Sequence, residues 1–246
     1  MQKHWKKIVI GVIALVVAAV AAFYIYALSK DDAPAKLDSG SLDSALATTT
    51  VAGETPDTAT PDTTTADTVA PSTPDGNWVI TGASSTVGYR IQEVLGGVDV
   101  EAAGRTDQVT GSLTIDGTQA SAGEFSVDMA TIASDDGRRD GQFRGRIMSV
   151  DQFPTATFVL TAPIDFGAVP TEGTAVTATA TGDLTLRGVT RSVTFEVEAR
   201  LEGGRIGVLG SIPILFSDYE IPDPSNVAAK VKDNGLLEFV LVFDRA

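Results

Sequence analysis

Residues 138–158 read Arg138-Arg139-Asp140-Gly141-Gln142-Phe143-Arg144-Gly145-Arg146-Ile147-Met148-Ser149-Val150-Asp151-Gln152-Phe153-Pro154-Thr155-Ala156-Thr157-Phe158. Its first half is a charged loop punctuated by glycines, and its second half enters a β-strand. From Ala156 onward the residues alternate, so that Ala156, Phe158 and Leu160 share one face of that strand. An apolar row with period two predicts a strand that buries one face.

The same alternation recurs along the chain after Trp78. About eight apolar rows follow one another, separated by turns that contain Gly and Asp. The rows begin at Val87, Val109, Phe125, Ala156, Val176, Val193, Ile206 and Leu237. This pattern predicts an all-β domain of eight antiparallel strands over residues 78–246.

The faces opposite two of these rows are polar. Thr177 and Thr179 oppose the row that begins at Val176, and Glu196 and Glu198 oppose the row that begins at Val193. A sheet with one apolar face and one solvent-exposed polar face fits a closed barrel and a β-sandwich equally well. The pattern by itself leaves both architectures open.

A second segment, Gly182-Asp183-Leu184-Thr185-Leu186-Arg187-Gly188-Val189-Thr190, reads as a strand that turns on Arg-Gly into the next strand. Together with the Arg138–Phe158 stretch it resembles the YceI-like family. Members of that family carry an Arg-Asp loop, a Phe-Pro-Thr-x-Thr-Phe strand and a Gly-Asp-Leu-Thr-x-x-Gly-Val-Thr hairpin. The resemblance covers roughly Trp78 to Phe243. It implies an eight-stranded, lipocalin-like antiparallel barrel, with a polyisoprenoid or similar long lipid as the ligand.

Three positions depart from the family pattern. Many members carry histidines where this chain has Ser84, Glu93 and Gln142. The chain's only histidine is His4, and it has no cysteine. A Ser-His triad, a thiolate nucleophile and His- or Cys-ligated metal are therefore excluded from residues 78–246. We expect no enzymatic activity, no metal and no cofactor.

The chain before Trp78 predicts three segments. Residues 1–7 form a short basic tail with three lysines, and residues 8–28 contain no charge. As a helix, residues 8–28 measure about 31 Å, which suffices for a transmembrane signal anchor. Because the lysines precede the span, the N-terminus is expected in the cytoplasm and the remaining chain outside it. Cleavage after Ser29 is the alternative.

Residues 29–77 are rich in Thr, Ala, Asp, Ser and Pro. Their larger apolar residues, among them Leu37, Leu42 and Leu46, are too sparse to build a core of their own. The composition predicts a disordered linker that separates the membrane from the barrel.

The net charge of the chain is −14, and its basic residues form no extended patch outside the Arg138–Arg146 loop. Nucleic-acid binding requires basic surfaces that neutralise phosphates, so we expect no nucleic-acid partner. Glu196 and Glu198 share one face of a strand, but a hydrolase would need such carboxylates to converge in a cleft.

The apolar interior is the main candidate site, because small residues among large ones leave volume for a ligand. The predicted lipid cavity is lined by Tyr89, Ile91, Phe125, Phe143, Ile147, Phe158, Ala180, Phe195, Phe216 and Phe239. Phe143 and Ile147 belong to a short helix expected over residues 142–150. At the cavity mouth, Arg139, Gln142 and Arg144 are predicted to meet the polar head of the lipid. The alternative is a structural pair of Arg139 and Asp140 that fixes the loop.

These observations predict a membrane-anchored, extracytoplasmic, non-catalytic protein that holds or carries a polyisoprenoid or similar long-chain lipid. The span over residues 8–28 would place it in the cell membrane, and a homodimer is compatible with this prediction. One alternative is a barrel with a filled core that acts as a cell-envelope interaction or stress-protection module. Another is a carboxylate-based hydrolase. The state of the interior distinguishes the three.

Overall fold

The computed structural model describes residues 33–47, 73–226 and 229–246, together with isolated positions between Leu15 and Ile25. The predicted basic tail, most of the predicted span over residues 8–28, and residues 29–32 and 48–72 of the predicted linker lie outside the described residues. Among the residues that are described, no helix is both long enough and apolar enough to cross a membrane.

Strands dominate the described chain after residue 73. They are β1 (Gly76–Ile80), β2 (Thr86–Leu95), β3 (Val98–Thr106), β4 (Val109–Asp116), β5 (Gln119–Asp128), β6 (Thr155–Leu160), β7 (Ile164–Asp165), β8 (Val176–Leu186), β9 (Val189–Glu202), β10 (Arg205–Leu215) and β11 (Ala229–Arg245). Their alternating burial matches the predicted period-two rows, as in β8 and β9.

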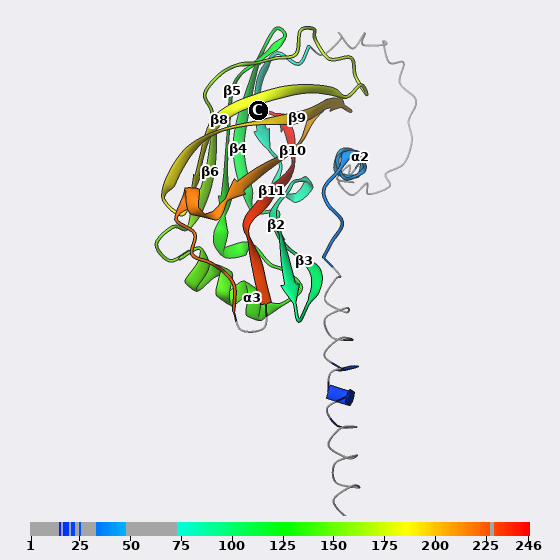
Figure 1. Ribbon diagram of the computed structural model, residues 1–246. Coiled ribbons are helices and arrows are strands. Elements are labelled where there is room, and N and C mark those ends of the chain that lie inside the picture. Colours follow the sequence, from blue (N-terminus) through cyan, green and yellow to red (C-terminus); the bar gives the residue numbers. More distant parts are fainter. Residues whose placement is uncertain are drawn as a thin grey trace, which may run out of the picture.

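Within the described residues, eight strands close an antiparallel barrel (Figure 1). The order around the barrel is β1-β4-β5-β6-β8-β9-β10-β11, and β11 pairs back with β1. In this closing pair, Trp78 lies opposite Arg245 and Ile80 lies opposite Phe243. The closure confirms the barrel and decides against the β-sandwich that the pattern had left open.

β11 pairs with two strands along the same edge. Its last residues, Phe243 to Arg245, pair with β1, and the longer part from Ala229 to Val240 pairs with β2. The hairpin of β2 and β3 therefore extends the barrel wall at one end. Short β7 pairs with β5 beside the main ring.

The same end of the barrel carries a helical cap. The cap consists of α3 (Gly137–Gln142) and the π-helical turn η3 (Phe143–Ile147). Asp136 begins it, because its carboxylate accepts a hydrogen bond from the Arg138 amide at 2.8 Å. The helix expected over residues 142–150 thus begins earlier, at this cap, and its helical part ends at Ile147. We refer to this end as the α3 end and to the opposite end as the far end.

The remaining helical elements are short. They are α2 (Ser39–Ala47) and the 3₁₀ turns η1 (Gly82–Ser84), η2 (Met129–Thr131) and η4 (Phe216–Tyr219).

The structure departs from the predicted linker at residues 33–47, which we call the strap. Its helix α2 lies on the outside of β10 and β11 (Figure 1). Leu42 is fully buried and Leu46 is nearly so, packed against Val240 and Val242 of β11. The sparse leucines need no core of their own, because the outward row of β11 is apolar and supplies the other half of a small cluster.

Candidate functional site

The barrel interior contains two cavities whose surfaces are apolar. The α3-end cavity has a volume of about 120 Å³ and lies beneath the cap and the loop after η4. The far-end cavity has a volume of about 100 Å³ and is lined by residues such as Ile115, Leu201 and Phe243. The interior is therefore neither completely filled nor one continuous tunnel.

Four phenylalanines lie between the two cavities and form a closed set of ring contacts, which we call the Phe cluster. Its members are Phe125 of β5, Phe158 of β6, Phe195 of β9 and Phe239 of β11. The ring centroids lie 5.5 Å apart for Phe125–Phe158, 5.4 Å for Phe158–Phe195, 6.0 Å for Phe195–Phe239 and 5.4 Å for Phe239–Phe125. Phe125 and Phe239 line both cavities. The cluster is thus a partition across the barrel, and each stacked or edge-on contact adds about 0.5–1.5 kcal/mol.

The structure brings together all ten residues that the sequence assigned to a cavity. Phe158, Ala180 and Phe195 line the far-end cavity. Those that line the α3-end cavity alone are Tyr89, Ile91, Phe143, Ile147 and Phe216. The remaining two, Phe125 and Phe239, line both. Their binding of a lipid stays a prediction.

One charged residue of the cap, Arg139, lines the α3-end cavity. Its guanidinium bonds the carboxylate of Asp135, and its Nη2 lies 3.5 Å from Oε1 of Glu93 on β2. Burial opposes the charge, but these two carboxylates outweigh it and raise the pKa of Arg139 above its ordinary value. Glu93 stands where many family members carry histidine. In this chain an ion pair of Glu93 and Arg139 therefore lies at the mouth of the cavity.

Tyr89 lies beside this pair, inside the α3-end cavity. Its ring stacks on Phe143, with centroids 5.1 Å apart and planes 10° apart. Burial raises the pKa of Tyr89 to about 12, although Arg139 pulls in the opposite direction. Tyr89 therefore presents a neutral hydroxyl at physiological pH.

The other predicted mouth residues do not line either cavity. Gln142 is exposed on the outer side of α3. Arg144 points its Nη1 to the carbonyl of Ile132 at 3.5 Å. The expected pairing of Arg139 with Asp140 is also not found, because neighbouring helical residues point in different directions. The buried carboxylate of Asp140 instead accepts hydrogen bonds from the amide and hydroxyl of Ser134.

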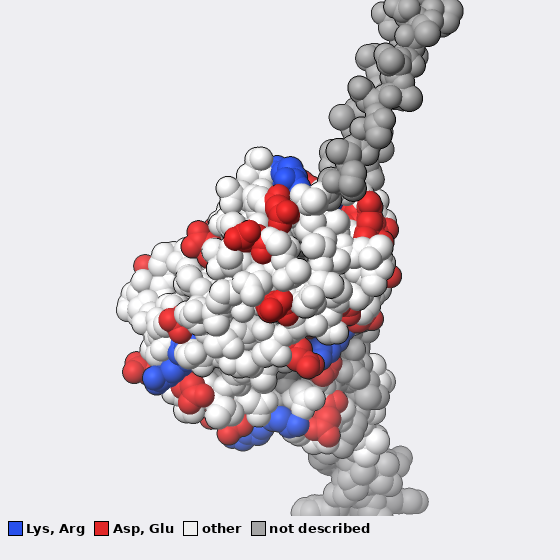
Figure 2. All heavy atoms as spheres, turned by 90° about the horizontal axis from the view of Figure 1, so that it is seen from above, with Lys and Arg blue, Asp and Glu red and all other residues white. Residues whose placement is uncertain are grey.

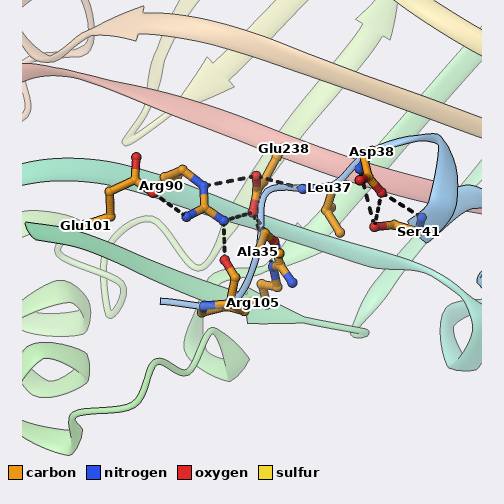
Figure 3. Close-up of polar contacts among 9 residues, drawn as sticks. Ala35, Leu37, Asp38, Ser41, Arg90, Glu101, Arg105 and Glu238 are labelled. Carbon is orange, nitrogen blue, oxygen red and sulfur yellow. Dashed lines mark hydrogen bonds and ion pairs between the residues drawn. The ribbon is translucent and has the colours of Figure 1, made fainter. Parts of the chain in front are cut away.

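Sequence reasoning missed a buried ionic cluster on the outside of the barrel (Figure 3). Glu238 of β11 is 1% exposed and lies between two guanidinium groups. Its Oε1 is 2.7 Å from Nη2 of Arg105 and 3.3 Å from Nη2 of Arg90. The strap covers the cluster: the amide of Leu37 donates to Glu238, and the two arginines donate to strap carbonyls.

The available signal for this cluster was the run Leu236-Leu237-Glu238-Phe239-Val240-Leu241-Val242-Phe243. It does not alternate, and a strand without alternation is usually covered on both faces. Glu196 and Glu198 lie on the outer face of β9. Glu198 accepts a hydrogen bond from Ser39 of the strap at 2.8 Å, and Glu196 is exposed. The carboxylates proposed for a hydrolase therefore do not converge in either cavity.

A model of the YceI-like domain matches residues 78–243, which comprise most of the chain. The chain belongs to the YceI-like family. Among curated relatives, UPF0312 proteins of Pseudomonas putida strains W619 and GB-1 are 33% and 32% identical over 123 residues. In each case the match covers 46% of this chain and 60% of the relative, so the chain spans under two thirds of their length.

Two solved structures resemble this YceI-like barrel over nearly their whole length. One is a polyisoprenoid-binding domain from Saccharophagus degradans implicated in plant cell wall breakdown. It is 18% identical in sequence with a TM-score of 0.56, and the match covers 69% of this chain and 98% of that chain. The other is BcnA of Burkholderia cenocepacia: 23% identity, TM-score 0.53, covering 66% of this chain and 98% of that one. At these identities the likeness shows the fold alone.

Proposed function

We propose that this YceI-like protein is a membrane-anchored, extracytoplasmic binding protein that holds a polyisoprenoid or similar long-chain lipid inside its barrel. The observation that carries the proposal is the pair of apolar cavities on either side of the Phe cluster. A binding domain of the same fold from Saccharophagus degradans is described as polyisoprenoid-binding, which supports this ligand class. The uncharged stretch over residues 8–28 supports the anchor.

The volumes of the two cavities limit how much of a lipid chain each can hold. An apolar protein cavity of about 150 Å³ takes up a single benzene molecule. Each cavity here is of similar size or smaller, so each accommodates only a short piece of hydrocarbon. A long chain that occupies both must displace rings of the Phe cluster. Burial of each methylene contributes about 0.8 kcal/mol, so several isoprene units supply enough free energy to move one ring.

The mouth of the α3-end cavity favours an uncharged polar head. Arg139 is the cation there, and Glu93 and Asp135 already place two carboxylates beside it. A phosphate would add negative charge to a site whose local balance is already negative. An alcohol or carbonyl can instead accept a hydrogen bond from Arg139 or the neutral Tyr89 hydroxyl. We infer that the head of the lipid is neutral.

Mass spectrometry of organic extracts from the purified full chain tests the proposal. We expect a long-chain, uncharged isoprenoid in the extract from the wild type. The Ala180→Trp variant fills the far-end cavity, which Ala180 lines while 2% exposed. It should remain folded and lose the lipid. A wild-type protein that neither copurifies with lipid nor binds added isoprenoid alcohol rules the proposal out.

The second candidate is a closed barrel that serves as a cell-envelope interaction module. The Phe cluster favours it, because its four rings pack against one another and separate the two cavities. If this candidate is correct, Ala180→Trp lowers the melting temperature by overpacking, and neither protein yields lipid.

A further inference from the structure

The strap has a direction along the barrel. The carbonyl of Pro34 accepts a hydrogen bond from Arg90, whose neighbour Ile91 lines the α3-end cavity. Further along the strap, Leu42 packs against Val242, whose neighbour Phe243 lines the far-end cavity. The strap therefore enters at the side of the α3 end and runs toward the far end.

The strap is held by independent contacts along its length. Its first residues bond the cluster of Arg90, Arg105 and Glu238 (Figure 3). At α2, Arg200 of β9 forms an ion pair with Asp43. The buried leucines of α2 add apolar packing on β10 and β11. The strap is thus a fixed part of the barrel wall, and its first residue has a defined position.

Only residues 29–32 separate the strap from the predicted end of the membrane span at residue 28. Four extended residues reach at most about 14 Å. Beyond Arg90, β2 continues for five residues toward the α3 end, a rise of about 17 Å along the strand. Because barrel strands tilt by about 35–45°, this corresponds to about 13 Å along the barrel axis. The maximum reach of the four residues covers this distance, so the tether permits the α3 end to contact the bilayer surface.

We propose that the strap holds the barrel with its α3 end against the bilayer, so that the α3-end cavity takes up lipid directly from the anchoring membrane. This inference rests on the proposed function, since it assumes the span over residues 8–28 and a lipid cargo. In this arrangement residues 29–77 do not act as a spacer that lifts the barrel away from the membrane. A short tether and the docked strap instead hold the barrel close to the membrane in a fixed orientation.

Charged side chains are exposed at both ends of the barrel. The exposed positions of the cap bear no carboxylate: they are Gly137, Arg138, Gly141, Gln142, Gly145 and Arg146. Figure 2 looks onto the far end, where acidic side chains are spread over the surface. Exposed carboxylates in the loops there include those of Asp75, Asp116, Asp165 and Glu172. Exposed carboxylates at the α3 end include those of Asp135, Asp218, Glu220 and Asp223, so surface charge does not distinguish the two ends.

The absence of cysteine from the chain allows a direct test of the orientation. Gln142→Cys places a single label on the cap, and Thr171→Cys places one in a far-end loop; both positions are exposed. The full chain carrying an environment-sensitive fluorophore is reconstituted into vesicles of phosphatidylcholine and phosphatidylglycerol. The vesicles contain a lipid with a quencher near its headgroup. We expect several-fold stronger quenching of the label at position 142.

A strap variant tests the cause of the orientation. Leu42→Asp with Leu46→Asp, introduced into Gln142→Cys, should release the strap and abolish most of the difference between the two ends. Ala47→Ser, at an exposed position of α2, is the matched control and should retain it. These leucines belong to a cluster outside the barrel core, so the barrel should keep its melting behaviour.

The possible failures can be told apart. Equal quenching at both positions, or stronger quenching at position 171, in protein that floats with the vesicles overturns the orientation alone. Protein that does not float with vesicles overturns the anchor and with it this inference. Organic extraction of the same samples reports the cargo separately, so an absence of lipid with asymmetric quenching leaves the orientation standing and removes the lipid-binding function.

Discussion

The ring of Phe239 lies directly over Gly210, its register partner on β10, so closely that a Cβ built on Gly210 would lie 2.3 Å from Cζ of the ring. Gly182 of β8 lies equally close to the ring of Phe158, although its register partner on β6 is Leu160; the distance from the built Cβ to Cζ of Phe158 is 2.4 Å. Each glycine lets one ring of the Phe cluster rest against the barrel wall. The cavities on either side of the cluster therefore depend on glycine at positions 182 and 210, because a Cβ at either position would push a ring into the interior.

Gly210→Ala should push the Phe239 ring toward the barrel axis. We expect a loss of about 1–3 kcal/mol in the free energy of unfolding, as is typical of overpacking, together with weaker lipid retention. Urea unfolding and quantification of extracted lipid measure the two effects. Gly123→Ala on β5 is the control for stability, because its Cβ would meet only an ordinary contact at 3.5 Å. Equal effects from both substitutions would contradict the role of Gly210.

Phe125→Ala should connect the two cavities, since Phe125 lines both of them. Removal of a fully buried aromatic ring typically costs about 3–5 kcal/mol of stability; Phe125 is half-buried, so the cost should be lower. If a long lipid has to displace the Phe cluster, the variant no longer has to move the Phe125 ring. Under conditions in which both proteins are folded, the variant should therefore bind an added isoprenoid alcohol more tightly than the wild type. Titration of both proteins with a fluorescent isoprenoid measures this. Weaker binding by a folded variant would argue against a displaceable partition.

Glu238→Gln should be strongly destabilising, because it leaves the charges of Arg90 and Arg105 facing each other under the strap. Removing one partner from a buried ionic cluster costs about 3–5 kcal/mol. Glu101→Gln removes a partner of Arg90 that is 42% exposed, and should cost below about 1 kcal/mol. Chemical unfolding of the two variants gives the comparison, and similar losses would show that the strap does not bury the cluster.

Leu42→Ala with Leu46→Ala should free the strap without unfolding the barrel. Lys36 is exposed, but the amide of the next residue, Leu37, donates to Glu238, so the peptide bond between them is held in the docked strap. Trypsin should cleave after Lys36 much faster in the double variant, because cleavage requires local release of the segment. Mass spectrometry follows the fragments, with Ala47→Ser as the control. An unchanged cleavage rate would mean that the leucines do not hold the strap.

The stability of the barrel should fall at high pH through Tyr89. Its pKa in the folded state is about 12, above the ordinary value near 10, so the folded protein retains a proton that the unfolded chain loses. This contribution is complete below about pH 10 and disappears as the pH rises through 12, with a magnitude on the order of 2 kcal/mol. Unfolding between pH 9 and about 12 should show a smaller decline for Tyr89→Phe. Parallel curves for the two proteins would remove Tyr89 as the cause.

The strands and the residues that face the interior follow from the alternation in the sequence. Alternation has period two whatever the neighbouring strand is, so Phe125, Phe158 and Phe239 could be assigned to one apolar interior from local pattern alone. The two family segments around Phe158 and Leu184 then indicated the barrel. The membrane span over residues 8–28 was also read from the sequence, and it stays a prediction.

Contacts between segments that are far apart in the chain depend on the folded structure as a whole. Closure of the barrel depends on pairing Trp78 with Arg245, and the strap depends on Leu42 meeting Val242. The division of the interior depends on how the Phe cluster packs. Local patterns cannot determine these relations, because each is a contact between segments far apart in the chain. The leucines of a segment with linker-like composition became buried because β11 offered them an apolar outer face.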